Sequence, residues 1–325
     1  MRQAIERLQG SLIREIANAG MGRADVLAFW FGESDEVTPD VIRRAAIESL
    51  ERGETFYSQN LGLPELRDGL ARYTSALHPP VGVERIVVTS GGVNGLMLAA
   101  QALVDAGDEV VVVTPVWPNL VAQPAIMGAT VRCVALEPVA GAWTLDMDKL
   151  LAAVTPRTRM LVVNAPNNPT GWTLARDEQQ RILDHCRATG TWLLADEVYE
   201  RLYFEPTPNR CAPSFLDIAA PDDRLVVAHL KTCRDTLVPL LAATPGVQVA
   251  TPRGGMYAFF KIDGFDDSMT VAKRLVAEAG LGLAPGAAFA PQAHGWLRWC
   301  FASKDIGRLA EGVRRLRAWL DVNGR

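Results

Sequence analysis

Short runs rich in β-branched residues alternate with segments of helical periodicity over the first two thirds of this 325-residue sequence. Several of these runs, 110–113 and 161–163 among them, are apolar on both faces, as strands covered by helices on two sides must be. The alternation predicts an α/β protein with a mainly parallel, buried sheet. The expected strands lie at residues 85–89, 109–113, 130–134, 159–164, 191–195 and 224–227.

The pattern changes beyond residue 228. Hydrophobic periodicity and composition here predict a few helices and strands in a less regular order, which is typical of a smaller α+β domain. The expected elements are a helix at about 229–243, a strand pair within 247–262, a helix at 269–279, a strand near 296–301 and a closing helix at 305–320.

Charge and cysteine usage favour small-molecule chemistry over binding to nucleic acid or membranes. The formal net charge is −4 and no long run of like charges occurs. Apolar stretches are too short for a bilayer span, and residues 1–20 contain several Arg and Glu residues, so we expect a cytoplasmic protein. Five widely spaced cysteines without C-x-x-C pairs and four histidines without an H-E-x-x-H pattern predict neither a disulfide framework nor a metal site.

Residues with useful chemistry follow the predicted strands at their carboxyl ends, where open α/β sheets bind ligands. Gly92 and Val93 open a helix, so their backbone N–H groups could hold a phosphate. A glycine pair before a helix is also a common tight turn. Trp117 follows the strand at 109–113, where its ring could stack on a planar cofactor or pack as a loop tryptophan.

Two further strand ends carry polar side chains. Asn168 lies in the turn-rich stretch 164–171, between two prolines. Asp196 ends the strand at 191–195, which places a carboxylate at the mouth of a buried sheet, and Tyr199 follows one turn later. A carboxylate there commonly faces a cation, and a structural capping aspartate is the alternative.

Together these motifs resemble, in order and spacing, those of class I/II aminotransferases that depend on pyridoxal 5'-phosphate (PLP). The resemblance covers nearly the whole chain. It rests on Phe31-Gly32-Glu33-Ser34-Asp35, Tyr57 with Gly62-Leu63-Pro64-Glu65-Leu66-Arg67, Ser90-Gly91-Gly92, Pro115-Val116-Trp117-Pro118, Asn167-Asn168-Pro169-Thr170-Gly171, Ala195-Asp196-Glu197-Val198-Tyr199, Pro285-Gly286 with Phe289, and Leu297-Arg298-Trp299-Cys300-Phe301.

The resemblance implies the PLP-dependent transferase fold of type I. It implies a large PLP-binding domain at 41–227 and a small domain at 228–325, which the N-terminal segment 1–40 joins. It also implies roles for the residues at the strand ends. Asp196 would keep the pyridine nitrogen of PLP protonated, so that the ring acts as an electron sink. Asn168 and Tyr199 would hydrogen-bond its phenolic oxygen, Trp117 would stack on the ring, and Gly92 and Val93 would bind its phosphate.

The same resemblance implies a homodimer and a substrate site. Tyr57 would reach the phosphate in the neighbouring subunit. Arg298 would bind the substrate α-carboxylate as a bidentate fork, and Gly32 would let the substrate approach. Without the resemblance, a surface arginine on a strand is the alternative for Arg298. The stretch 251–257 is expected to border the substrate pocket.

One part of the family pattern is missing. The family has an S-x-S-K stretch with the Schiff-base lysine after the strand equivalent to 224–227, followed by a further strand and a long helix, and about 60 residues are expected to be absent here. The absent strand lies inside the family's sheet, so its loss should give a smaller, re-paired sheet or a fold of reduced stability. Lys231 lies 35 positions after Asp196, close to the family spacing, but it lacks flanking serines. It is a candidate for the catalytic lysine or a solvated helix lysine.

The resemblance therefore implies amino-group transfer between an amino acid and a 2-oxo acid, with activity in question because the lysine segment is missing. Two alternatives stay open. One is a PLP-dependent lyase or racemase, because these enzymes use the same electron sink. The other is a non-catalytic PLP-binding pseudoenzyme.

Overall fold

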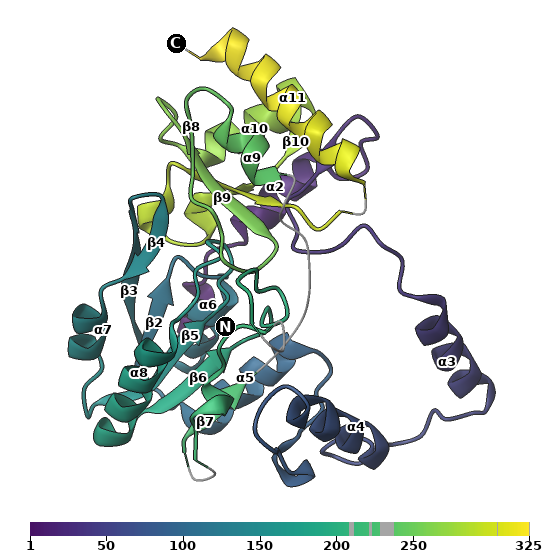
Figure 1. The fold of residues 1–325 in the computed structure, drawn as a ribbon, viewed down its shortest axis with the longest axis vertical. Coiled ribbons are helices and arrows are strands. Elements are labelled where there is room, and N and C mark those ends of the chain that lie inside the picture. Colours follow the sequence, from purple (N-terminus) through teal and green to yellow (C-terminus); the bar gives the residue numbers. More distant parts are fainter. Residues whose placement is uncertain (208–210, 221–222, 228–236, 304, 325) are drawn as a thin grey trace.

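The computed structural model describes residues 1–207, 211–220, 223–227, 237–303 and 305–324. Two sheets organise these residues (Figure 1). The larger sheet contains β2 (Glu109–Thr114), β3 (Thr130–Val139), β4 (Ala142–Leu145), β5 (Thr158–Asn164), β6 (Trp192–Asp196) and β7 (Leu225–Val227). The smaller sheet contains β8 (Val247–Val249), β9 (Tyr257–Ile262), β11 (Ala284–Pro285) and β12 (Trp296–Cys300).

The larger sheet has the order β4-β3-β2-β5-β6-β7 and is parallel except for β4, which forms a hairpin with β3. Its central strands are buried on both faces. On β2, Val111 and Val113 pack in one core cluster, while Val110 and Val112 pack in another on the opposite face. The first face is covered by α7 (Met147–Ala153) and α8 (Arg176–Thr189), the second by α5 (Gly92–Leu103) and α6 (Asn119–Met127).

The smaller sheet is antiparallel, in the order β11-β12-β9-β8. It packs with helices from both ends of the chain into a third core cluster. A two-residue parallel pairing of β1 (Leu27–Ala28) with β10 (Leu281–Gly282) ties the N-terminal segment to this lobe. The helices are α2 (Leu12–Gly20), α9 (Leu237–Ala242), α10 (Ser268–Ala279) and α11 (Ile306–Asn323). A short α1 (Gln3–Glu6) precedes them.

Helices α3 (Asp40–Glu51) and α4 (Pro64–Ser75) form an arm, which we define as residues 37–75. Figure 1 shows α3 standing apart from both sheets, joined to the rest by extended segments. No residue of α3 is buried, and in α4 only Ala71 is. The arm is therefore held by few contacts within the chain described here.

Most of the elements expected from the sequence are present, including the strands at β2, β3, β5, β6 and β7 and the strand pair β8–β9. The prediction of a strand at 85–89 is wrong. A 3-10 turn (η1, Val83–Arg85) occupies its start, and the following backbone is bonded to the arm instead of to a sheet. Val88 N–H donates to the Leu61 carbonyl, and Arg67 donates to the carbonyls of Val83 and Ile86.

The larger sheet ends at β7, and within the described residues no strand pairs with the outer edge of β7. One of the two outcomes expected from a missing strand, a re-paired sheet, does not form through residues 85–89, because these residues form no strand. None of the helices in the described ranges is long and apolar enough to cross a bilayer.

Candidate active site

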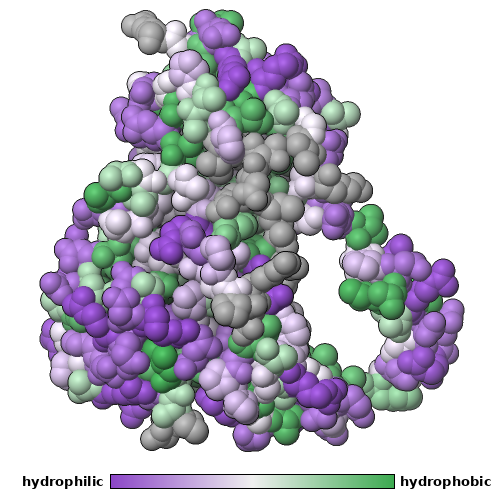
Figure 2. All heavy atoms as spheres, in the orientation of Figure 1, coloured by the Kyte–Doolittle hydropathy of each residue, from purple (hydrophilic) through white to green (hydrophobic). Residues whose placement is uncertain are grey.

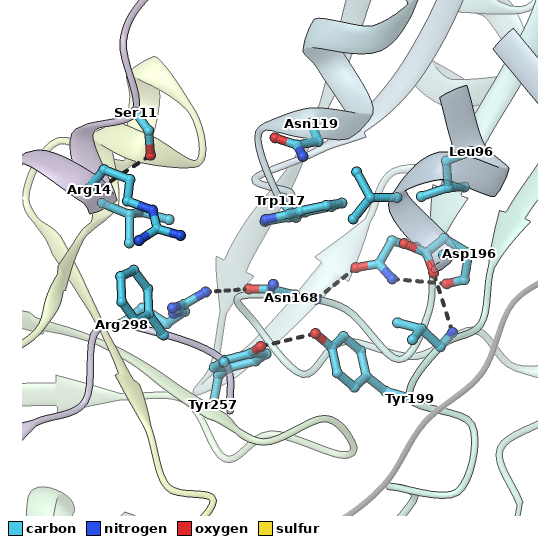
Figure 3. Close-up of a pocket in the computed structure, with 17 residues that line it drawn as sticks. Ser11, Arg14, Leu96, Trp117, Asn119, Asn168, Asp196, Tyr199, Tyr257 and Arg298 are labelled. Carbon is cyan, nitrogen blue, oxygen red and sulfur yellow. Dashed lines mark hydrogen bonds between the residues drawn. The ribbon is translucent and has the colours of Figure 1, made fainter. Parts of the chain in front are cut away.

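A cavity of about 540 Å³ lies beyond the carboxyl ends of β2, β5 and β6, against residues of the smaller lobe. Parallel strands place the residues that follow them at one edge of the sheet, so segments distant in sequence meet there. Figure 3 shows these side chains directed toward a common space. Eight of the expected site residues line the cavity: Gly32, Gly92, Val93, Trp117, Asn168, Asp196, Tyr199 and Arg298.

Asp196 is the last residue of β6 and is only 5% exposed. It pairs in register with Asn164 on β5, whose side-chain amide donates to the Asp196 carbonyl at 2.9 Å. The Asp196 carboxylate accepts a hydrogen bond from Val198 N–H at 3.3 Å. The side chain thus stabilises the turn after β6 and also presents a buried carboxylate to the cavity.

The turn after β5 holds Asn168 in place. Asn164 Oδ1 accepts from the Asn168 backbone N–H at 2.8 Å, and Asn167 Oδ1 accepts from the N–H of Thr170 at 3.0 Å. All four of these side chains are buried. The backbone of Asn168 is bound to the Asn164 side chain, and its own side-chain amide points into the cavity toward Arg298 (Figure 3).

Arg298 on β12 is 2% exposed, so the alternative of a surface arginine is wrong. Its Nη1 donates to Asn168 Oδ1 at 3.1 Å, and Nη2 donates to the Trp30 carbonyl. Its guanidinium lies 4.4 Å from the ring centroid of Tyr257 and 5.0 Å from that of Phe289. Its Nε has no hydrogen-bond partner, and within the described ranges no carboxylate forms an ion pair with it. The site therefore contains a buried cation that forms no ion pair with any of the described residues.

Two tyrosines close the floor of the cavity. Tyr199 Oη and Tyr257 Oη are hydrogen-bonded at 2.9 Å, with the rings edge to face. Burial raises the pKa of Tyr199, and it raises the pKa of Tyr257 well above its usual value, so both stay neutral hydroxyls near pH 7. Gly32 makes room for this pair, because a Cβ there would lie 1.8 Å from Tyr257 Oη.

The opposite wall is the start of α5. Gly91, at φ 113°, lets the chain turn into the helix at Gly92. The first N–H groups of a helix have no partner within it, so those of Gly92 and Val93 are available to an anion in the cavity. In Figure 3, Trp117 lies above Asn168, and Leu96 of α5 and Asp196 lie to the right of the indole. A planar, anionic ligand therefore fits between the helix start, the indole and the Asp196 carboxylate.

A family model described as aminotransferase class I and II matches residues 25–229 and 225–316. The chain belongs to this family. Its PLP dependence and its reaction, amino-group transfer between an amino acid and a 2-oxo acid, agree with the cavity just described.

Three relatives illustrate the similarity. The probable aspartate/prephenate aminotransferase of Aquifex aeolicus is 28% identical over 367 residues, covering 91% of this chain and 91% of that protein. The aspartate aminotransferase of Pyrococcus horikoshii is 27% identical, covering 97% and 95%. The structure of an aspartate aminotransferase from Thermotoga maritima superposes with a TM-score of 0.85 at 25% identity, covering 99% and 100%. These relatives are named as aminotransferases, so a lyase, a racemase or a pseudoenzyme is not favoured.

One expected residue of this aminotransferase, Tyr57, is not brought to the cavity. Tyr57 lies between α3 and α4, is fully exposed and does not line the cavity. Lys231 lies outside the described residues. Of the lysines within them, Lys149, Lys261 and Lys273 each pair with a surface carboxylate, and none lines the cavity.

Sequence reasoning missed Ser11, Arg14 and Asn119, which also line the cavity. Ser11 and Arg14 belong to the start of α2, whose amphipathic pattern marks a surface helix and says nothing of a ligand. Only the packing of the N-terminal segment on the smaller lobe brings them here.

Proposed function

We propose that this aminotransferase holds PLP between α5, Trp117 and Asp196 and binds the α-carboxylate of an amino acid or 2-oxo acid at Arg298. The observation that carries the proposal is the buried Arg298 guanidinium with its unpaired Nε. A charge taken out of water without a counter-charge costs several kcal/mol. Contacts with two aromatic rings and two oxygen acceptors offset only part of this, and a carboxylate ligand would complete the site.

The cofactor contacts follow from the same geometry. Asp196 would bind the pyridine nitrogen, Asn168 and Tyr199 the phenolic oxygen, and the N–H groups of Gly92 and Val93 the phosphate. Bound PLP supplies an electron sink for the substrate. The role of the chain is to orient both molecules and, through the neutral Tyr199 hydroxyl, to donate a hydrogen bond.

The lysine that would bind PLP covalently is not found in the sequence context expected for the family. We infer that the family's lysine segment is absent after residue 227, which leaves Lys231 as the candidate lysine. Two findings support the gap: the family match divides at 225–229, and the alignment with the P. horikoshii relative runs over 375 residues, more than the 325 of this chain. The spacing of 35 residues from Asp196 supports Lys231.

Borohydride reduction of the PLP-loaded protein, followed by peptide mapping, tests both points. A label on Lys231 that is lost in Lys231→Arg and kept in Lys261→Arg would establish a relocated lysine. Bound PLP without any labelled lysine would retain the cofactor site and reject Lys231. Failure to bind PLP at all, judged by equilibrium dialysis, would overturn the proposed function.

We also propose a homodimer that covers the arm. The exposed apolar residues of α3 include Val41, Ile42, Ile47 and Leu50, from 53% to 74% exposed. Figure 2 shows apolar side chains on the surface of this arm. A helix with no buried residue has few tertiary contacts to stabilise it, and a second copy would supply them. The resemblance implies that Tyr57 would reach the partner's site, and such a role would account for its exposure.

Sedimentation equilibrium tests the dimer. Leu50→Asp should shift the protein toward a monomer, because it places a charge in the proposed interface. Val322→Asp is the matched control, because Val322 is 82% exposed on α11, away from the arm. A monomeric wild-type protein, or equal masses for both variants and the wild type, would reject this interface.

A further inference from the structure

A second guanidinium, that of Arg14, lies at the mouth of the same cavity. Arg14 is in the first turn of α2, whose buried residues Ile13, Ile16 and Ala17 pack in the core of the smaller lobe and fix the helix. The guanidinium carbon lies 4.6 Å from the centroid of the Phe31 ring, which also lines the cavity. The packing of α2 and this stacking contact hold Arg14 at the entrance.

Arg14 forms no ion pair within the part of the chain that the structure describes. Its neighbour Glu15 is bound by Lys273. Other arginines of the same lobe are paired with carboxylates, as Arg274 is with Glu278 and Arg308 with Asp35. Acidic residues are therefore available to this lobe, yet none of the described ones forms an ion pair with the guanidinium that faces the cavity.

Arg14 and Arg298 lie at the same end of the cavity. Figure 3 shows both guanidinium groups on one side of Trp117 and Asn168, with Asp196 on the other. The cofactor contacts proposed above occupy the Asp196 side. The end that remains for the substrate thus carries two positive charges, one buried and one at the rim.

We propose that Arg14 binds the second carboxylate of a dicarboxylic amino acid or 2-oxo acid whose α-carboxylate is bound by Arg298. This inference rests on the proposed function and names its substrate class. Guanidinium groups bind carboxylates as bidentate pairs, so two of them at one end of a site select a ligand with two carboxylates. A monocarboxylic substrate would satisfy Arg298 and leave Arg14 in water. Arg14 determines specificity in this arrangement and takes no part in the chemistry.

Calorimetric titration of the PLP-loaded protein with succinate and with butyrate tests the proposal. Both ligands have four carbons, differ in the second carboxylate and lack an amino group, so no turnover occurs. We expect succinate to bind the wild type at least about tenfold more tightly than butyrate, the usual effect of one charge-assisted hydrogen-bonded pair. Arg14→Gln should abolish that preference by weakening succinate binding, with butyrate and PLP binding unchanged.

Arg7→Gln is the matched control, because Arg7 is also exposed in the N-terminal segment and does not line the cavity. It should keep the preference for succinate. Equal binding of the two ligands by the wild type, or equal weakening of both in Arg14→Gln, would overturn the role of Arg14. If Arg14→Gln weakens PLP instead, Arg14 binds the phosphate and the inference fails. The proposed function itself would be refuted if the wild type bound neither carboxylate ligand, or if Arg298→Gln weakened the binding of neither.

Discussion

The free energy of unfolding should fall between about pH 6 and pH 9.5, because His78 loses its proton. Replacing His78 with glutamine should remove most of this pH dependence. His78 follows α4 and is buried, with 2% of its side chain exposed. Its Nδ1 lies 2.7 Å from Asp217 Oδ1, and its Nε2 lies 2.9 Å from Glu200 Oε2. An imidazolium can donate to both carboxylates at once, whereas the neutral ring can donate to only one.

Burial by itself would lower the pKa of His78, but the hydrogen bonds to Asp217 and Glu200 and the charges of the two carboxylates raise it from 6.5 to about 9. The folded protein therefore keeps the proton over a range in which the unfolded chain releases it. The stabilisation is fully present below about pH 6.5 and is lost as the pH rises through about 9. The difference in pKa corresponds to about 3 kcal/mol of unfolding free energy.

Asp217 also makes stability depend on pH, but outside the range from about pH 6 to pH 9.5. Burial would raise the pKa of Asp217, but the bonds from His78 and Arg176 outweigh it and lower the pKa to about 2. Because this pKa is depressed, its contribution is present above the unfolded value of 3.8 and is lost only as the pH falls toward 2. Asp217 therefore contributes nothing to changes between about pH 6 and pH 9.5, and the comparison with a variant that lacks His78 isolates the histidine.

Urea unfolding at about pH 6 and pH 9.5 measures the effect as the difference between wild type and His78→Gln. The wild type should lose about 3 kcal/mol more than the variant over this interval. His185→Gln is the control, because the His185 ring bonds the Val154 carbonyl and not a carboxylate. If His78→Gln does not fold, NMR titration of the four wild-type histidines replaces it, and one should titrate at about pH 9. Parallel pH profiles, or no histidine titrating above about pH 8, would refute the reasoning.

Two other substitutions test the site. Gly32→Ala places a Cβ 1.8 Å from Tyr257 Oη and should lower the unfolding free energy by about 1–3 kcal/mol in urea, whereas Gly10→Ala, which meets open space, should change it by less than about 0.5 kcal/mol. An equal effect of both would show that Tyr257 moves aside freely. Arg298→Lys keeps the charge but loses the fork, and should weaken butyrate binding about tenfold or more in calorimetry. Unchanged affinity would place the carboxylate elsewhere.

The class of the fold and the polar residues at the strand ends that line the cavity are readable from the sequence because both depend on local chemistry. The strands β2, β5 and β6 are apolar on both faces, which only burial between helices permits. Asn168 and Asp196 stand at the ends of such strands, and the parallel arrangement then brings them to one edge. Neither inference needs a contact between distant parts of the chain to be known in advance.

Residues 85–89 show where local chemistry misleads. Their β-branched composition is compatible with a strand, but a strand forms only where a partner offers a ladder of hydrogen bonds. Here the partners are Leu61 and Arg67 of the arm region, so the segment stays irregular. Within the described residues, β7 also has a partner on one side only, since β-pairing is a property of two segments and not of one.

The sequence by itself determined the parallel sheet, the strand ends that carry polar groups and the family to which the chain belongs. Tertiary structure alone decided that Arg298 is buried with no ion pair to the described residues, that Arg14 faces the same cavity and that Gly32 accommodates Tyr257. The physical reason is that side-chain periodicity and turn chemistry act over a few residues, whereas burial, ion pairing and close approach depend on which distant segments pack together.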